Sequence, residues 1–168
     1  MTMQIRQLVH SLEVLADSFG RAVYAGGDTA AALACVTDSV EVANLPHGVT
    51  ARGAAELRRR LDEDLAPHLP PDLTFRRVSR TADQRRLVDE SVVAFTHDRA
   101  LPWLLPGVPA TGRPVEVLAI TVVSAEHRSR LGLTTTLIDR HRTLWDYAGL
   151  LAQLRLDPAD AAALLARG

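Results

Sequence analysis

The sequence contains no lysine, and all 19 of its basic residues are arginine. Without a lysine amine, the chain can neither form a Schiff base with a carbonyl substrate nor supply the lysine of a phosphate-binding P-loop. Its single cysteine, Cys35, excludes an internal disulfide bond and a cysteine-cluster metal site. Cys35 lies in an alanine-rich helical stretch, and we interpret it as a buried, unreactive thiol.

A strong net charge and long apolar runs are also missing. With 20 acidic and 19 basic residues the net charge is −1, so no global field attracts nucleic acid or an anionic membrane. No apolar run can span a bilayer, and the N-terminal residues lack the apolar region of a signal peptide. The 6 histidines show no dense metal-ligand spacing. The sequence predicts a cytoplasmic protein without metal or cofactor.

The periodicity of the apolar residues predicts an α+β fold. Residues recurring every three or four positions predict helices from about residue 5 to before Gly26, near 29–36 and over 54–66. Alternating apolar residues predict strands over 39–45, 73–81, 85–97, 113–126 and 131–146, followed by helices over 147–156 and 159–167. We expect one domain over residues 1–168, with a helical extension from about 155, in which a curved, mostly antiparallel sheet closes around the N-terminal helices.

Residues 88–117 form the stretch in which titratable and aromatic groups lie closest to apolar sequence. Two valine-rich strands flank a proline-rich loop that carries Trp103. Small-molecule pockets are usually built from such a mixture. Alternation along residues 91–99 places Phe95 and His97 on one face, which we expect to line the pocket, and Asp98 on the other unless a strand-end bulge turns it inward.

The second half of the chain contains a Gly-x-Pro-x-Thr-Gly-Arg element, a last strand with Ile, His and Asp, and a Gln-Leu pair. The residues of these motifs are Gly107, Pro109, Thr111, Gly112, Arg113, Ile138, His141, Asp146, Gln153 and Leu154. Their order and spacing resemble the SnoaL-like branch of the nuclear transport factor 2 superfamily, and the similarity covers about residues 10–155.

The resemblance implies a cone-shaped barrel, often a homodimer, with a deep apolar pocket between sheet and helices. In cyclases of this branch an Asp on the last strand is the general acid/base, and Asp146 occupies the matching position. Their neighbouring His would fall near residues 119–121, where this chain has none. Other members are isomerases, dehydratases, epoxide hydrolases or binding domains, so the fold does not determine the function.

The candidate catalytic residues are therefore Asp146, His97, Glu90 and Asp98. Asp146 shares a strand face with Ile138, Arg142 and Leu144, but could instead cap the helix that begins at Tyr147. His97 is equally compatible with a structural histidine. Glu90 would have a raised pKa if buried among its apolar neighbours, or could be a solvated charge on the convex face.

The candidate substrate-binding residues are Trp103, Phe95, Arg142, Asn44 and Tyr24. Trp103 either lies on a loop that covers the ligand or fills space in the core.

The sequence leaves two hypotheses for the function. The first is a cofactor-independent cyclase, isomerase, dehydratase or epoxide hydrolase acting on an apolar polyketide- or terpenoid-like molecule in bacterial secondary metabolism. The second is a non-catalytic binding or dimerisation module. Since both faces of residues 115–123 are apolar, we also expect a homodimer.

Overall fold

The computed structural model describes residues 3–165 of the chain. Three N-terminal helical segments, α1 (Met3–Arg21), the π-helical η1 (Ala22–Gly26) and α2 (Thr29–Leu33), precede strands β1 (Val36–Leu45) and β2 (Gly48–Arg52). Helix α3 (Ala54–Arg60) continues through the π-helical η2 (Leu61–Leu65) and the 3-10 turn η3 (Ala66–His68). Strands β3 (Thr74–Ala82), β4 (Arg86–Thr96), β5 (Pro114–Arg130) and β6 (Leu133–Trp145) follow, and helices α4 (Tyr147–Leu154) and α5 (Pro158–Leu165) end the described chain.

The strands form one 6-stranded sheet in the order β2-β1-β6-β5-β4-β3. Among the strands of residues 3–165, β1 and β6 are the only parallel neighbours, and the other pairs are antiparallel. The α+β class and the curved, mostly antiparallel sheet predicted from the sequence are thus confirmed. The sequence pattern missed β2, whose five residues form an edge strand directly after the turn at Pro46.

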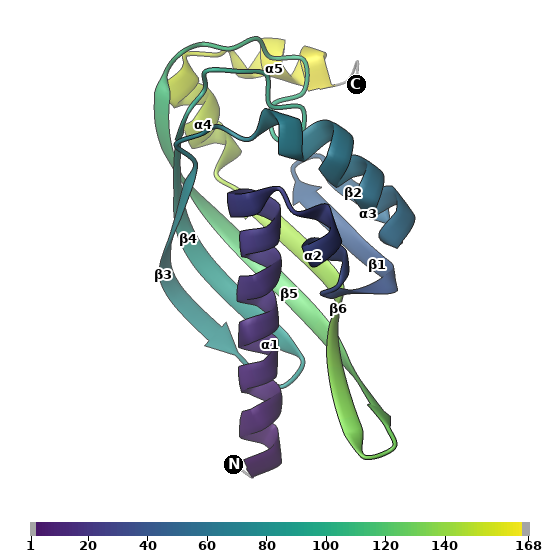
Figure 1. Ribbon diagram of the computed structural model, residues 1–168. Coiled ribbons are helices and arrows are strands. Elements are labelled where there is room, and N and C mark those ends of the chain that lie inside the picture. The colour runs from purple at the N-terminus through teal and green to yellow at the C-terminus, as the bar shows by residue number, and fades with distance from the viewer. Residues whose placement is uncertain (1–2, 166–168) are drawn as a thin grey trace.

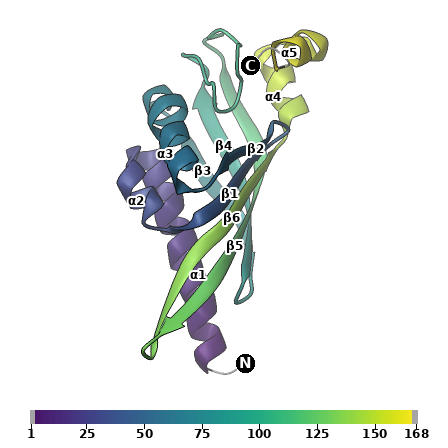
Figure 2. The same cartoon turned by 90° about the vertical axis from the view of Figure 1, so that its right-hand side faces the viewer.

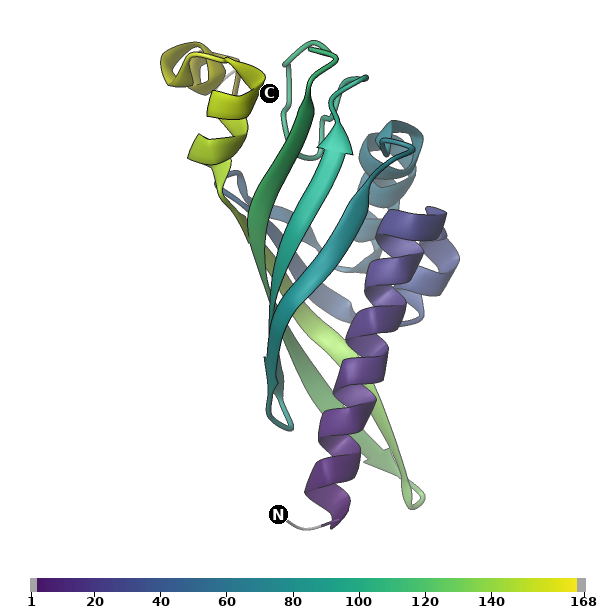
Figure 3. The ribbon, with the colours of Figure 1, turned by 90° about the vertical axis from the view of Figure 1, so that its left-hand side faces the viewer.

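The N-terminal helices cover one face of the sheet (Figures 1 and 2), and α1 lies along its concave side beside β3 and β4 (Figure 3). The apolar stripe of α1 explains this position, because Leu12 and Phe19 are buried in a cluster with Leu87 of β4, Val123 of β5 and Ile138 of β6. Burial of such side chains typically stabilises the fold by about 1.5–3 kcal/mol each.

A second apolar cluster fills the other end of the sheet. It joins Phe95 of β4 to the loop of residues 98–113, hereafter the covering loop, and to α4. Leu101, Leu104 and Leu105 of this loop are fully buried. The loop is therefore part of the core. Helix α4 is fixed to the sheet by Gln153, whose side-chain amide exchanges two hydrogen bonds of 2.9 Å with the backbone of Glu116.

Candidate functional site

Two cavities lie between the helices and the concave face of the sheet. The larger cavity, about 750 Å³, is enclosed by β1, β2, β6, the α3–η2 segment and the covering loop. The smaller cavity, about 390 Å³, lies between α1 and the strands β3 to β6. Tyr24 of η1 and His141 of β6 line both cavities. The volume of the larger cavity suits a drug-sized organic ligand.

Strand β6 presents His141, Thr143 and Trp145 to the interior. They lie opposite Val123, Thr121 and Ala119 of β5, and all three of these β6 side chains are buried. Because side chains alternate along a strand, the intervening residues point outward. Arg142 is exposed on this outer face, so the structure does not place it at either cavity, contrary to the expectation from the sequence.

Asp146 also lies outside both cavities. Its side chain is exposed and accepts a hydrogen bond of 2.9 Å from the backbone N–H of Gly149, which makes it the N-cap of α4. Gly149 permits this close contact because an added Cβ would lie 2.1 Å from the Asp146 carboxylate. The capping alternative describes the observed geometry, and the structure does not place the Asp146 carboxylate at either cavity.

His97 is completely buried, but it does not line either cavity. Its Nδ1 is 3.1 Å from the hydroxyl of Thr111, and its backbone carbonyl accepts hydrogen bonds from the N–H groups of Thr111 and Gly112. Burial lowers the pKa of His97, and the nearby charge of Asp98 opposes this effect. The residue therefore anchors the end of the covering loop.

The other two predicted catalytic carboxylates are also remote from the cavities. Glu90 accepts a hydrogen bond of 3.1 Å from the Ser79 hydroxyl and projects from β4 on the face opposite to Asp89 and Ser91, which line the smaller cavity. Asp98 is exposed and paired with Arg99 at 2.8 Å, and this hydrogen bond lowers the pKa of Asp98. The structure does not bring Glu90, His97, Asp98 and Asp146 together at a site.

Three of the predicted substrate-binding residues, Tyr24, Asn44 and Trp103, do line the larger cavity. Asn44 of β1 accepts a hydrogen bond from the indole N–H of Trp145 and donates one to the backbone carbonyl of Trp103. The ring centroid of Trp103 lies 6.1 Å from those of Tyr24 and Trp145. Phe95 shares the predicted inward face of β4 but is packed in the second apolar cluster.

His141 is the titratable residue that the sequence analysis did not select for catalysis. Its ring packs against Phe19 at a centroid distance of 4.9 Å, and the residue is 7% exposed. Burial lowers the pKa of His141 to about 4, although the charge of Asp89 acts in the opposite direction. His141 is therefore neutral at neutral pH. His141 alternates with Trp145, whose large apolar ring favours the interior, and this was the signal that could have identified it.

Tyr24 provides a hydroxyl at the same junction. Burial raises the pKa of Tyr24 to about 12, so its hydroxyl stays protonated and can donate a hydrogen bond at neutral pH. Its ring packs against Phe75 of β3 at a centroid distance of 4.6 Å. Together, Tyr24 and His141 offer a hydrogen-bond donor and a proton acceptor to a ligand that occupies the junction of the cavities.

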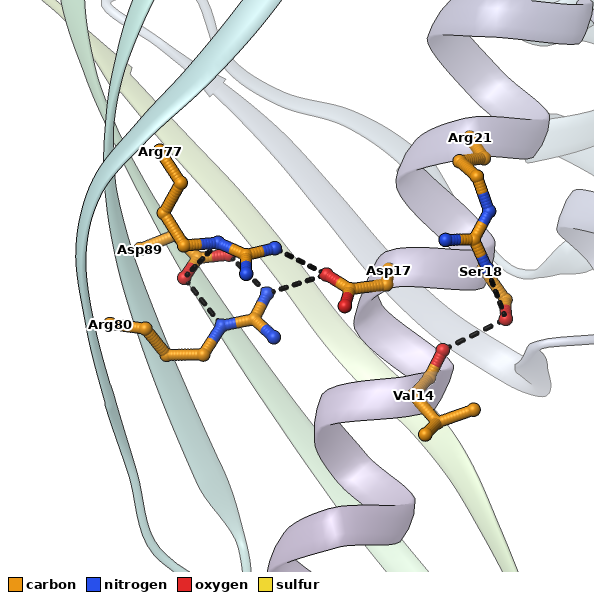
Figure 4. A network of polar contacts seen from close by, with 7 residues as sticks. All are labelled: Val14, Asp17, Ser18, Arg21, Arg77, Arg80 and Asp89. Carbon is orange, nitrogen blue, oxygen red and sulfur yellow. Dashed lines mark hydrogen bonds and ion pairs between the residues drawn. The ribbon is translucent and has the colours of Figure 1, made fainter.

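A charged cluster forms one wall of the smaller cavity (Figure 4). Arg80 of β3 donates two hydrogen bonds of 2.7 Å to Asp89 of β4 and one of 2.7 Å to Asp17 of α1. Arg77 of β3 pairs with Asp17 at 2.5 Å and with Asp89 at 3.4 Å. Burial raises the pKa of Asp17, but the hydrogen bonds and charges of Arg80 and Arg77 outweigh burial and lower it. The hydrogen bond to Asp89 raises the pKa of Arg80.

Within residues 3–165, no group of three His, Cys, Asp or Glu side chains is arranged to hold a metal ion. None of the helices in this range combines the length and the apolar character needed to cross a membrane.

No family model matches the chain, and no curated protein matches it. Solved structures, in contrast, do match the chain. A SnoaL-like protein from Jannaschia sp. CCS1 is 15% identical with a TM-score of 0.65, the alignment covering 94% of this chain and 98% of that one. A SnoaL-like polyketide cyclase from Agrobacterium tumefaciens is 19% identical with a TM-score of 0.59, covering 86% and 98%.

A third structure, from Catenulispora acidiphila, has a ketosteroid isomerase-like fold and is in complex with trimethylamine. It is 15% identical to this chain with a TM-score of 0.58, covering 87% of this chain and 95% of its own. This chain therefore has the fold shared by SnoaL-like and ketosteroid isomerase-like proteins, and the fold predicted from the resemblance is confirmed.

Proposed function

We propose that the protein is a cofactor-independent acid/base enzyme that acts on an apolar, polyketide- or terpenoid-like small molecule. The observation that carries this proposal is the position of His141 and Tyr24 at the junction of two cavities. A cavity plugged by apolar side chains would instead favour a non-catalytic module. The larger cavity is open, and ionisable groups face it.

In this proposal the neutral imidazole of His141 removes a proton from a carbon next to a substrate carbonyl. The electron pair of the broken C–H bond moves onto the carbonyl oxygen, where the hydroxyl of Tyr24 stabilises the developing negative charge by a hydrogen bond. The carboxylate of Asp89 stabilises the imidazolium electrostatically. Return of the proton from His141 to another carbon of the substrate completes an isomerisation. In a cyclisation the enolate carbon instead attacks a second carbonyl carbon, and the oxygen of that carbonyl takes the electron pair of the broken π bond and the proton from the imidazolium of His141.

The similarity in fold to a polyketide cyclase supports this substrate class, and we place the reaction in bacterial secondary metabolism in the cytoplasm. Aromatic groups on the cavity side, among them Trp103 and Tyr24, suit a flat, apolar ligand.

Hydrogen exchange with solvent tests the proposal without knowledge of the natural substrate. A bicyclic ketone such as 2-tetralone is incubated in D₂O with the protein, and deuterium incorporation next to the carbonyl is followed by NMR. The proposal predicts exchange above the buffer rate. Binding of the ketone by calorimetry without any added exchange, for this and related ketones, would support the non-catalytic module instead.

Trp103 is expected to report ligand binding. Its indole lies at the wall of the larger cavity on the covering loop, so a ligand that fills the cavity changes its surroundings from partly hydrated to dry. Titration with 2-tetralone should change the tryptophan emission of the wild type and of Trp145→Phe. The same titration of Trp103→Phe should leave the emission nearly constant. An equal response in Trp103→Phe would show that the ligand binds elsewhere.

We also propose a homodimer formed through the outer face of the sheet, which the N-terminal helices leave uncovered (Figure 2). Its centre is apolar, with Val92 beside Leu118 and Ile120 beside Leu144 in the strand register. Leu118 and Leu144 are 40% and 38% exposed. Oppositely charged side chains, Glu90 and Arg142, flank this centre on different strands, so a two-fold arrangement can pair the acid of one copy with the base of the other.

Leu118→Arg is expected to convert the dimer to a monomer, because each copy would insert a cation into the apolar centre of the interface. Sedimentation equilibrium at micromolar concentration measures this change. Leu133→Arg is the matched control, since Leu133 is 75% exposed and lies at the start of β6, away from this face. A wild-type monomer at that concentration would contradict the proposal.

A further inference from the structure

We infer that the smaller cavity binds an anionic group of the substrate, such as a carboxylate, so that the substrate is an apolar acid held across both cavities. This inference rests on the proposed function and specifies its substrate class. It is carried by the charges of the smaller cavity and by the position of that cavity next to His141.

Arginine is in excess around this cavity. Asp17 and Arg21 of α1, Arg77 of β3 and Asp89 of β4 line it, and Arg80 lies behind Asp17 and Asp89. Three guanidinium groups thus surround two carboxylates and leave one positive charge. His141, the other titratable base at the wall, is neutral at neutral pH because burial lowers its pKa to about 4. The field in the cavity therefore favours an anion.

The two carboxylates are already occupied by arginine. Asp89 receives two hydrogen bonds of 2.7 Å from Arg80, and Asp17 receives one from Arg80 and one from Arg77. The side chain of Arg77 is 44% exposed and uses only part of its five N–H donors on these carboxylates. Its remaining donors are free for a bidentate contact with a substrate carboxylate.

Arg21 supplies the unmatched charge. The ion pairs of the cluster involve Arg77 and Arg80, whereas the contact of Arg21 is with the hydroxyl of Ser18 at 3.4 Å. Figure 4 shows the guanidinium of Arg21 beside Ser18 on α1, without a contact to the Asp17 carboxylate. Such a long contact to a neutral hydroxyl is easily exchanged for an anion.

The location of the two cavities sets the orientation of the substrate. An anion held by Arg77 and Arg21 places the neighbouring part of the molecule at Tyr24 and His141, which line both cavities. The apolar body then extends into the larger cavity, past Leu61 and toward Trp103. The charged end thereby fixes which carbon of the substrate faces the imidazole.

Three matched probes test the inference: 2-naphthoic acid, its methyl ester and 2-naphthylmethylamine, each titrated by calorimetry at pH 7.5. They share the apolar body and differ in charge. We expect the acid to bind more tightly than the ester by about 10-fold or more, because its carboxylate accepts charge-assisted hydrogen bonds that the ester cannot form. The amine should bind most weakly. Arg21→Gln should lower the affinity for the acid about 5-fold or more and leave the affinity for the ester unchanged.

Arg76→Gln is the control, because Arg76 is an exposed arginine of β3 that lines neither cavity and should not alter the preference for the acid. Arg77→Gln is the second variant, used with circular dichroism to verify folding because Arg77 also contacts Asp17. Equal affinities for acid and ester, or tighter binding of the amine, would overturn the inference. The proposed function would survive that outcome if the wild type still catalysed exchange of 2-tetralone, so the two failures are distinguishable.

Discussion

Replacing His141 with glutamine is expected to lower the rate of deuterium exchange into 2-tetralone by about 10²- to 10⁴-fold, the range typical of one positioned general acid/base. His141 is the imidazole that lines both cavities, and glutamine retains polarity and similar size but cannot accept a proton at neutral pH. The affinity for the ketone, measured by calorimetry, should change little, so the loss should appear in kcat. A variant with wild-type kcat would remove His141 from the mechanism.

The pH dependence follows from the pKa of about 4 that burial imposes on His141. The imidazole is neutral from about pH 5 upward, so catalysis by the base form should be nearly constant between pH 6 and 8 and fall as the pH approaches 4. The free energy of unfolding should also decrease as the pH falls. The unfolded chain, with a histidine pKa near 6.5, binds the proton more readily, so stability is lost as the pH falls from about 6.5 to 4, by about 3 kcal/mol at most.

Acid unfolding monitored by circular dichroism should therefore be shallower for His141→Gln than for the wild type over this range. His97→Gln is the matched comparison, because burial also lowers the pKa of His97 but the residue lies outside both cavities. It should alter acid stability in the same direction and leave kcat nearly unchanged.

Asp146 provides the control for catalysis. Asp146→Asn should keep both activity and stability, since asparagine caps a helix nearly as well as aspartate, whereas Asp146→Ala should lose about 1 kcal/mol of stability and keep kcat. A fall of 10²-fold or more in Asp146→Asn would restore the role that the family resemblance suggested for this residue.

Replacing Arg80 with methionine is expected to destabilise the protein by about 3 kcal/mol, the lower end of the range for removing one partner of a buried ion pair. The Arg80 side chain is 11% exposed and bridges Asp89 and Asp17, which are 15% and 33% exposed. Without it the two carboxylates face each other, and Arg77 alone remains to compensate them. Urea unfolding should show the loss as a lower midpoint with an unchanged slope.

Arg76→Met is the matched control, because Arg76 is an exposed arginine of the same strand. Its effect should lie within about 0.5 kcal/mol of zero. Adding Asp89→Asn to Arg80→Met should restore part of the lost stability, since it removes one of the uncompensated carboxylates. Equal midpoints for Arg80→Met and Arg76→Met would show that the cluster contributes no more than an exposed charge.

The fold was predictable because its main elements have strong apolar periodicity. The stripe of α1 and the long alternating runs of β5 and β6 indicated helix and strand without reference to the rest of the chain. Strand β2 was missed because five residues after a proline turn carry little periodic signal, and its conformation depends on pairing with β1.

The candidate site was harder to predict because one irregularity in β6 reverses the orientation of the side chains. Ser124 pairs with Arg140 but Ala125 pairs with Ile138, so Asp139 is an extra residue in the register. Strict alternation from the apolar Ile138 groups Asp146 with this inward-facing residue. Because of the shift, His141 is the residue that points inward. A shift of one residue exchanges the two faces of a strand, and the alternation of apolar residues did not show where in β6 the shift occurs.

The parallel pairing of β1 with β6 determines when the larger cavity can be completed during synthesis. The hydrogen bond from Trp145 to Asn44, at the wall of this cavity, joins residues 101 positions apart. Contacts of such long sequence separation are costly in chain entropy and form slowly. During synthesis on the ribosome, β1 cannot pair with β6 until β6 has emerged. A truncated chain that ends before β6 would therefore expose the β1 edge for pairing with other chains. Aggregation of such fragments is the consequence of a cavity whose walls are far apart in the sequence.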